Sequence, residues 1–306
     1  MRIRFDGRVA IVTGAGGGLG RCYALELARR GAAVVVNDLG GAVDGGGGST
    51  SMAQAVVDEI TTAGGTAVAN HDSVADRAAA QRMVDEAVSR FGSMDIIVNN
   101  AGILRDRTFA KMELDDFQKV VDVHLMGSVN VTKAAFPVMK ERGYGRIVLT
   151  TSSSGLYGNF GQANYAAAKL GLVGFMNTLK LEGAKYGIKV NSVAPTAATR
   201  MTDGLWAPEV LDAVAPEHVV PAVIYLCSED SPNGHIIEAG GTYFARVAIV
   251  EARGVVLGPQ ATAEDVAARY EEIADLSGSR TFDSGLEIAT TILKAVSGAS
   301  GNADGP

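Results

Sequence analysis

A tyrosine and a lysine lie four residues apart in the segment Tyr165-Ala-Ala-Ala-Lys169, and Ser152 precedes the tyrosine by thirteen residues. On a helix this spacing places the phenol and the ammonium on one face. A free tyrosine has a pKa near ~10, too high for a general base at neutral pH. A neighbouring positive charge favours the phenolate and lowers that pKa. The tyrosine could then take a proton from a hydroxyl that Ser152 orients, while a hydride leaves the same carbon.

A glycine-rich turn could hold the hydride acceptor. Residues 13–20 read Thr-Gly-Ala-Gly-Gly-Gly-Leu-Gly, between the first predicted strand and the first predicted helix. Glycines there let the backbone approach a pyrophosphate, and the helix N-terminus supplies N–H donors. In this strand–loop–helix context we expect dinucleotide contacts from Gly14, Gly18, Leu19 and Gly20.

Asp38 ends the second predicted strand, eighteen residues beyond Gly20, and no basic residue follows it directly. A carboxylate at this place accepts hydrogen bonds from the adenosine ribose and repels a 2′-phosphate. The sequence therefore favours NAD over NADP. The alternative is a strand-end aspartate that caps a turn.

Two further segments follow strands at the same sheet edge. Asp72 and Ser73 follow the third strand, where they could contact the adenine or cap the next helix. The fourth strand ends in Asn100-Ala101-Gly102, for which we predict cofactor contacts, although these residue types also suit a tight turn.

The elements that position these residues alternate along the chain. Continuous apolar, β-branched runs predict buried parallel strands at 9–12, 33–36, 66–69, 96–98, 146–150, 188–193 and 235–238. Helical patterns lie near 19–30, 51–63, 75–91, 114–141, 163–186 and 215–228. This alternation predicts an α/β fold with a doubly wound parallel sheet of about seven strands.

Composition excludes several classes of protein. Of 306 residues, 47% are apolar and 20% charged, which indicates a folded chain, and the net charge of −7 argues against nucleic-acid or anionic-membrane partners. No apolar run is long enough for a membrane span. Two cysteines and a charged start without a signal peptide predict a cytoplasmic protein. His71, His218 and His235 lack the spacing of metal ligands, so we expect no metal site.

Two segments interrupt the alternation. Residues 40–50 contain six glycines and could form a flexible connector or a mobile cover over a bound ligand. About 65 residues follow Gly241, with helical patterns at 262–274 and 285–296. We therefore predict an NAD-binding domain over 1–241 that includes the catalytic residues, and a C-terminal extension over 242–306.

The glycine turn, Asn99-Asn100-Ala101-Gly102, Ser152 and Tyr165-x-x-x-Lys169 together resemble the short-chain dehydrogenase/reductase family in order and spacing, over about residues 5–241. The resemblance implies NAD at the carboxyl edge of the sheet. It also implies catalysis by Ser152, Tyr165 and Lys169, with Tyr165 and Lys169 at the nicotinamide end and Pro195 near the nicotinamide amide.

A narrower resemblance rests on residues 35–41, 100–106 and 154–165. These segments look like the (3R)-hydroxyacyl-CoA dehydrogenase unit of peroxisomal multifunctional enzymes type 2, which implies oxidation of a (3R)-3-hydroxyacyl-CoA to the 3-ketone. Relatives of this group imply an alternative, a hydroxysteroid or sterol-side-chain acyl-CoA dehydrogenase. A 3-oxoacyl-carrier-protein reductase and a non-catalytic NAD sensor are weaker alternatives. The resemblance also suggests a homodimer in which the extension completes the partner's pocket.

Two positions depart from the wider family. His124 stands where most members have an asparagine that supports a water beside the lysine, so it could support the same relay or only pack. Thr196 follows Pro195 where many members have glycine, which puts the contact to the nicotinamide amide in doubt. Residues 199–216, with Trp206, are expected to cover the substrate.

Overall fold

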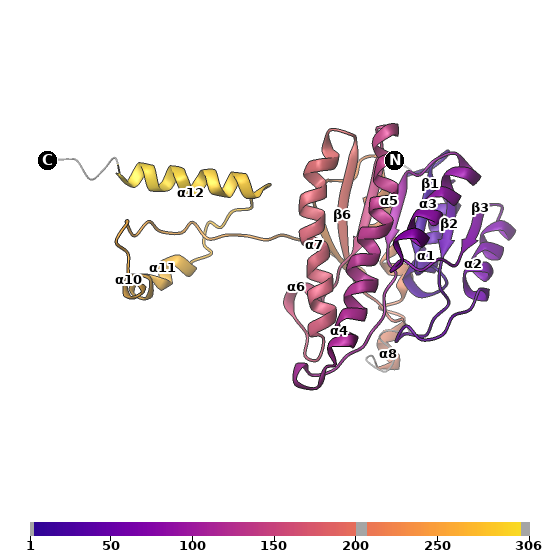
Figure 1. Ribbon diagram of the computed structural model, residues 1–306, viewed down its shortest axis with the longest axis horizontal. Helices are drawn as coiled ribbons and strands as arrows, with labels where there is room; N and C mark the ends of the chain where they lie inside the picture. The colour runs from indigo at the N-terminus through magenta and orange to yellow at the C-terminus, as the bar shows by residue number, and fades with distance from the viewer. Residues whose placement is uncertain (1–2, 200–206, 301–306) are drawn as a thin grey trace. The chain divides into compact units, whose positions relative to one another are not determined.

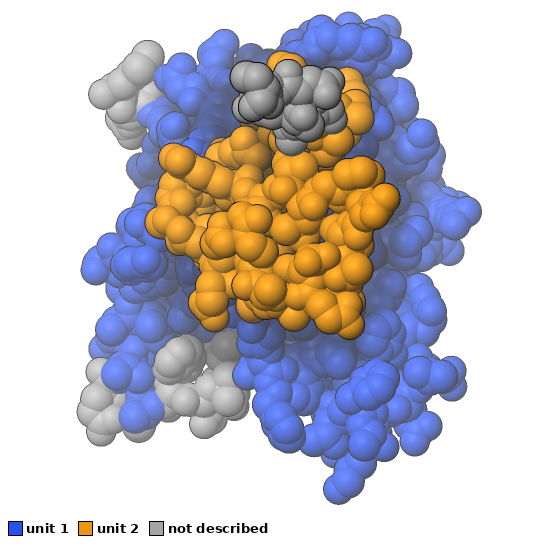
Figure 2. All heavy atoms as spheres, turned by 90° about the vertical axis from the view of Figure 1, so that its left-hand side faces the viewer, with its two compact units in different colours: residues 1–246 blue, residues 247–306 orange. Residues whose placement is uncertain are grey.

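The computed structural model describes residues 3–199 and 207–300 of the chain. The chain divides into two compact units, residues 1–246 and residues 247–306, which Figure 2 shows in blue and orange. The predicted domain boundary after Gly241 falls between the last two strands of the sheet.

The first unit is built on one eight-stranded sheet in the order β3-β2-β1-β4-β5-β6-β7-β8. The first seven strands pair in parallel, and Ile11 of the central strand lies between Val35 and Ile97. The strands are β1 (Val9–Thr13), β2 (Ala33–Asn37), β3 (Thr66–Asn70), β4 (Ile96–Asn99), β5 (Gly145–Thr150), β6 (Ile188–Thr196), β7 (Ile236–Gly240) and β8 (Tyr243–Val247). The predicted parallel sheet is confirmed.

The eighth strand was not expected from the sequence. The chain turns at Gly241, whose positive φ of 57° suits a glycine, and β8 returns to bond to β7. β8 is largely exposed, so its sequence lacks the continuous apolar run that marks the inner strands.

Helices cover both faces of this sheet. Helix α1 contacts α2 and α9 in one layer, while α3 contacts α5 and α4 contacts α7 in the other; α5 and α7 are the long helices beside the sheet in Figure 1. The helices are α1 (Gly18–Arg29), α2 (Ser51–Thr62), α3 (Arg77–Phe91), α4 (Leu114–Val121), α5 (Gly127–Arg142), α6 (Ser153–Tyr157), α7 (Ala163–Ala184), α8 (Pro208–Leu211) and α9 (Val220–Cys227), with 3₁₀ turns at Phe109–Lys111 and Pro216–His218. Because both faces are covered, every residue of β1, β4 and β5 is buried.

The predicted helix over 114–141 is a continuous helical segment interrupted by a π-helical turn. A π-helical turn, Asp122–Met126, separates α4 from α5 and carries His124. Such turns are rare and are frequent at functional sites. Here the turn places the imidazole inside the protein, where it is 1% exposed.

The second unit contains α10 (Ala263–Ala268), α11 (Tyr270–Ala274) and α12 (Gly285–Ser300). The pattern over 262–274 forms two short helices, the first closed by a capping box between Thr262 and Asp265. None of the side chains described in this unit is buried, and Leu286 and Leu293 are exposed. No described helix has the length and apolar character to cross a membrane.

Candidate active site

The glycine turn after β1 has the backbone that its sequence suggests. Gly14 and Gly18 have positive φ angles of 63° and 50°. A Cβ on Gly20 would lie 2.2 Å from the Gly14 carbonyl oxygen, so only glycine lets the first turn of α1 pack on the loop. Gly17 occupies the N-cap and offers no side chain to the first N–H groups, and no acidic residue lies in the first turn. This helix end is suited to a phosphate.

Asn100 fixes the glycine turn from the neighbouring strand. Its Nδ2 donates to the carbonyl oxygens of Thr13 (3.0 Å) and Gly14 (3.1 Å). In return, the Thr13 hydroxyl accepts from the N–H groups of Asn100 (3.0 Å) and Ala101 (3.1 Å). The amide of Asn100 is therefore engaged in holding two loops together at the sheet edge.

Asp38 connects the turn to the loop that follows β2. One carboxylate oxygen accepts from the Gly16 N–H (2.7 Å), and the other accepts from the Gly40 N–H (2.6 Å). A Cβ on Gly16 would lie 2.8 Å from the Asp38 carboxyl carbon, so a side chain there would displace the carboxylate. This position is compatible with both roles suggested by the sequence. The carboxylate accepts hydrogen bonds within a turn, and it also lines a cleft where a ribose could bind.

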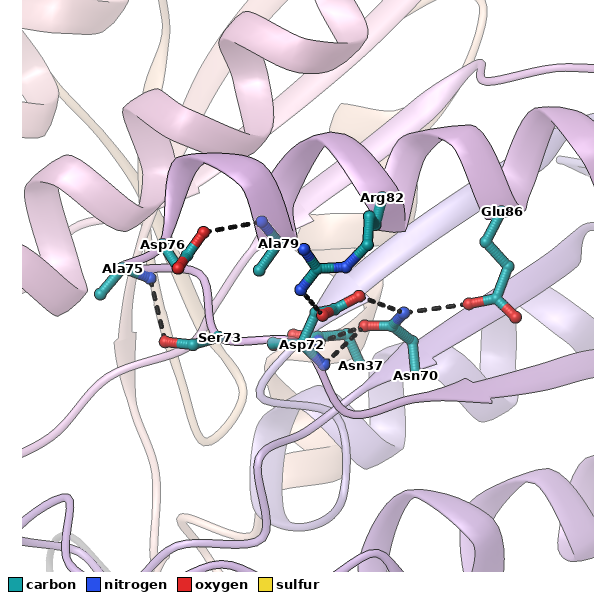
Figure 3. A network of polar contacts seen from close by, with 9 residues as sticks. All are labelled: Asn37, Asn70, Asp72, Ser73, Ala75, Asp76, Ala79, Arg82 and Glu86. Atoms are coloured by element: carbon teal, nitrogen blue, oxygen red, sulfur yellow. Dashed lines mark hydrogen bonds and ion pairs between the residues drawn. The ribbon is translucent and has the colours of Figure 1, made fainter.

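Asp72 lies in a polar network at the end of β3, shown in Figure 3. Its carboxylate accepts from Arg82 Nη2 (2.5 Å) and Asn70 Nδ2 (3.2 Å), and its carbonyl accepts from Asn37 Nδ2 (2.8 Å). The network fixes the backbone of this part of the sheet edge.

The N-cap of α3 is neither Asp72 nor Ser73, the two residues that the sequence suggested for it. Asp76 accepts from the Ala79 N–H (2.8 Å) and caps the helix, while Ser73 accepts from the Ala75 N–H (3.3 Å) in the preceding turn (Figure 3). Asp72 and Ser73 are therefore not the helix cap.

One cleft collects most of the predicted cofactor residues. Its walls include Gly14, Gly18, Leu19, Asp38, Asp72, Ser73, Asn100, Ala101 and Gly102. Gly20 lies under the turn, and Pro195, Tyr165 and Lys169 are not among the residues that line this cleft.

Sequence reasoning missed several residues of the cleft. Ala42, Val43 and Gly45 line it from the loop after β2, and Lys119 and Val123 line it from α4 and the π-helical turn. The only sequence signal was the glycine content of residues 40–50. Thr199 also lines the cleft, whereas residues 200–206 of the predicted substrate cover, with Trp206, lie outside the described part of the chain.

The structure brings Ser152, Tyr165 and Lys169 together beyond the end of β5. Ser152 caps α6 and its hydroxyl accepts from the Ser154 N–H (3.2 Å). Lys169 is 3% exposed, and its Nζ donates to the Thr150 carbonyl (2.6 Å) and lies 5.4 Å from the centroid of the Tyr165 ring. The i, i+4 prediction for this pair on α7 is therefore consistent with the geometry.

Burial shifts both titratable groups toward their neutral forms. Desolvation lowers the pKa of Lys169 from 10.5 to about 7. Burial also raises the pKa of Tyr165, against a hydrogen bond with Ser152 that lowers it. The expected lowering of the Tyr165 pKa by Lys169 is thus not seen here, because burial dominates.

His124 contacts both Tyr165 and the segment after β4. Its ring meets that of Tyr165 edge-on, with centroids 5.1 Å apart, and its Nε2 lies 3.0 Å from the Ile103 nitrogen and 2.7 Å from the Ile103 oxygen. A Cβ on Gly102 would lie 2.2 Å from the imidazole, which explains the glycine. Burial, reinforced by the charge of Lys169, holds the pKa of His124 well below its usual value, so the ring is neutral.

Comparison with known proteins agrees with this geometry. The short chain dehydrogenase family model matches residues 8–209. A putative short-chain type dehydrogenase/reductase of Mycobacterium tuberculosis, Rv0148, is 54% identical over 274 residues, which cover 89% of this chain and 96% of the relative.

The chain is also similar to a longer protein. Peroxisomal multifunctional enzyme type 2 of Drosophila melanogaster is 47% identical over 300 residues, which are 96% of this chain but 50% of that protein. The solved structure of that enzyme superimposes with a TM-score of 0.82 at 40% identity over the same shares of the two chains. The chain thus spans about half the length of this relative.

A third likeness is to a 7α-hydroxysteroid dehydrogenase solved with NADH and a 7-oxo bile acid, with a TM-score of 0.70 and 29% identity over 78% of this chain and 94% of that one. Together with the paired Ser152, Tyr165 and Lys169, these matches show that the chain belongs to the short-chain dehydrogenase family, whose members are oxidoreductases that act on hydroxyl groups with a nicotinamide cofactor.

Proposed function

We propose that the protein oxidises the 3-hydroxyl of a (3R)-3-hydroxyacyl-CoA to the 3-ketone with NAD, in lipid breakdown of the β-oxidation type. The observation that carries the proposal is the grouping of the buried Ser152 and Lys169 with the partly buried Tyr165, at the same sheet edge as the glycine turn. The likeness of 96% of the chain to a peroxisomal multifunctional enzyme type 2 supports the substrate class.

The residues of the cleft fit a dinucleotide. The uncapped first turn of α1 would hold the pyrophosphate, and the Asp38 carboxylate would accept bonds from the adenosine ribose. Asp72 and Ser73 would border the adenine, and Lys169 would hold the nicotinamide ribose. The Asp38 charge would repel a 2′-phosphate, which supports NAD over NADP. When bound, the oxidised nicotinamide supplies a hydride acceptor and a positive charge.

The three catalytic side chains would then divide the work. Ser152 holds the substrate oxygen, and the phenolic oxygen of Tyr165 takes its proton as the C–H bond gives up the hydride. Because burial raises the Tyr165 pKa, the phenolate needs nearby positive charge, which Lys169 would add from the same face of α7 in its protonated form.

Purified protein would be mixed with NAD and matched (3R)- and (3S)-3-hydroxyacyl-CoA thioesters, with NADP and a Tyr165→Phe variant in parallel. We expect reduction of NAD with the 3R thioester, and a rate at least about a thousandfold lower in the variant, which retains the ring but lacks the proton acceptor. Absence of turnover with both epimers would refute the acyl-CoA substrate.

The likeness to the 7α-hydroxysteroid dehydrogenase favours one alternative, a hydroxysteroid or a sterol-side-chain acyl-CoA. The chemistry would be unchanged, since only the group attached to the secondary alcohol differs. Hydroxysteroids and steroid-side-chain thioesters in the same assay would show this function if they turn over and straight-chain thioesters do not.

We propose a homodimer because the second unit exposes apolar side chains. All of its described side chains are at least partly exposed, including large apolar ones such as Leu286 and Leu293. Apolar surface of this kind favours burial in an interface. Light scattering after size exclusion is expected to give twice the chain mass of 31.6 kDa. A cytoplasmic location stays a prediction.

A further inference from the structure

The loop after β2, residues 39–49, has a defined conformation despite its six glycines. Its backbone closes on itself through Ala42 N–H to the Gly46 oxygen (2.8 Å), Gly45 N–H to the Ala42 oxygen (3.0 Å) and Ser49 N–H to the Leu39 oxygen (3.2 Å). Glycine-rich segments lose much conformational entropy when they are ordered. Contacts outside the loop therefore matter for keeping it beside the cleft that it lines.

Loop 39–49 contacts residues 103–105 after β4 through three neighbouring interactions. The Leu104 N–H donates to the Val43 oxygen (2.9 Å), and Arg105 Nε donates to the Asp44 oxygen (2.9 Å). Gly45 lies over Ile103, since a Cβ on this glycine would be 3.2 Å from the isoleucine side chain.

Arg105 also connects this segment to the helices of the active site. Its Nη1 donates to Asp116 of α4 (2.5 Å), and the two side chains are both about one third exposed. Its carbonyl oxygen accepts from Asn164 Nδ2 (2.9 Å). Asn164 is fully buried, directly precedes the catalytic Tyr165, and accepts from the Tyr165 N–H (2.8 Å).

We propose that Arg105 is a positioning residue that fixes loop 39–49 beside the nucleotide cleft and connects it to the start of the helix that carries Tyr165. The proposal rests on the proposed use of this cleft for NAD. A planar guanidinium has donors on separate edges and can bind the Asp44 carbonyl and the Asp116 carboxylate at the same time. The ordering cost of the loop is then met before the nucleotide arrives, which tightens binding.

The proposal also explains why the same segment serves both ends of the site. Ile103 contacts loop 39–49 on one side and the His124 ring on the other, and His124 meets Tyr165 edge-on. A change in loop position would therefore reach the catalytic tyrosine through Ile103 and Arg105. The expected sign of such coupling is that loss of the Arg105 contacts weakens NAD binding and lowers kcat together.

The test uses the full chain and three variants. Arg105→Met removes both donors, Arg105→Lys keeps the charge for Asp116 without the second donor for Asp44, and Arg107→Met is the matched control, because Arg107 is exposed and has no polar side-chain partner among the described residues. Amide hydrogen exchange of residues 39–49 is measured without nucleotide, and NAD affinity is measured by calorimetry.

We expect exchange in loop 39–49 to rise about tenfold in Arg105→Met and Arg105→Lys, and the Kd for NAD to rise about three- to tenfold, with both values unchanged in Arg107→Met. Asp116→Asn, which weakens the anchor of the guanidinium, should give a smaller rise and replaces Arg105→Met if that variant does not fold. Loop exchange equal to that of the wild type in the Arg105 variants would overturn the proposal.

The two proposals fail in different ways. If the wild type binds no NAD while exchange still rises in the Arg105 variants, the role of Arg105 in fixing the loop holds and the cofactor assignment fails. If the wild type binds NAD and Arg105→Met binds it equally well, the cofactor assignment stands and the role of Arg105 in nucleotide binding is refuted.

Discussion

Replacing Lys169 with methionine should stabilise the nucleotide-free protein near neutral pH while it removes activity. Methionine has a similar length and no charge, so the buried site keeps its packing. Burial lowers the pKa of Lys169 from 10.5 to about 7, and each pH unit is worth about 1.4 kcal/mol. The buried ammonium therefore lowers the free energy of unfolding by at most about 5 kcal/mol at low pH. Its hydrogen bond to Thr150 offsets about 1 kcal/mol of this cost.

The sign and the pH window follow from these two values. Between pH 7 and 10.5 the unfolded lysine holds a proton that the folded one has lost, so wild-type stability rises with pH in this range. The gain in free energy of unfolding from Lys169→Met should accordingly shrink by about 3 kcal/mol between pH 6.5 and 9.5. Urea unfolding at both pH values measures this difference.

The control is Lys133→Met on α5, where the side chain is exposed and its removal should give no such dependence on pH. A difference between Lys169→Met and the wild type that stays constant from pH 6.5 to 9.5 would refute the reasoning. It would mean that Lys169 remains charged in the folded protein throughout this range.

Three other changes test the walls of the site. Gly102→Ala places a Cβ against His124 and should cost about 2–3 kcal/mol of unfolding free energy in urea, and a loss below 0.5 kcal/mol would contradict the packing. Asp38→Ser should raise the Kd for NAD about tenfold and reduce discrimination against NADP, which calorimetry with both nucleotides measures. An unchanged preference for NAD over NADP would contradict the role of the carboxylate. The folded pKa of His124 lies below 6.5, so the unfolded chain takes up its proton first and wild-type stability falls as pH drops below about 6.5. His124→Phe should lack this acid loss, and identical pH profiles of the two proteins would argue against a buried neutral imidazole.

The fold could be predicted because its central strands are buried on both faces. A strand covered by helices on either side needs apolar residues at every position, and β1 shows this in an unbroken run. The sequence order of these runs and of the helical patterns is enough to define a parallel sheet. The motifs that follow each strand then meet at one edge, which is why most predicted cofactor residues line a single cleft.

The features that were missed depend on contacts between distant residues. The π-helical turn at Asp122–Met126 leaves no local mark in a helical pattern, since it shifts the backbone by one residue without a proline or glycine inside the turn. Arg105 and Asp44 are 61 residues apart, and their bond joins a side chain to a carbonyl that any residue could supply. No pattern of residue types can indicate such a bond.

The charge state of the site is a further property that residue types do not determine. The Tyr165–Lys169 spacing suggested a phenolate favoured by its lysine, yet burial biases both groups toward neutrality. The same burial lowers the effective dielectric, so a positive charge placed beside Tyr165 acts on it more strongly than it would in water. A tyrosine that is reluctant to ionise in the resting protein is thus one whose proton affinity responds steeply to its neighbours. Its ionisation then depends on the charges brought beside it, and the contacts of His124 and Asn164 fix where its ring stands relative to them.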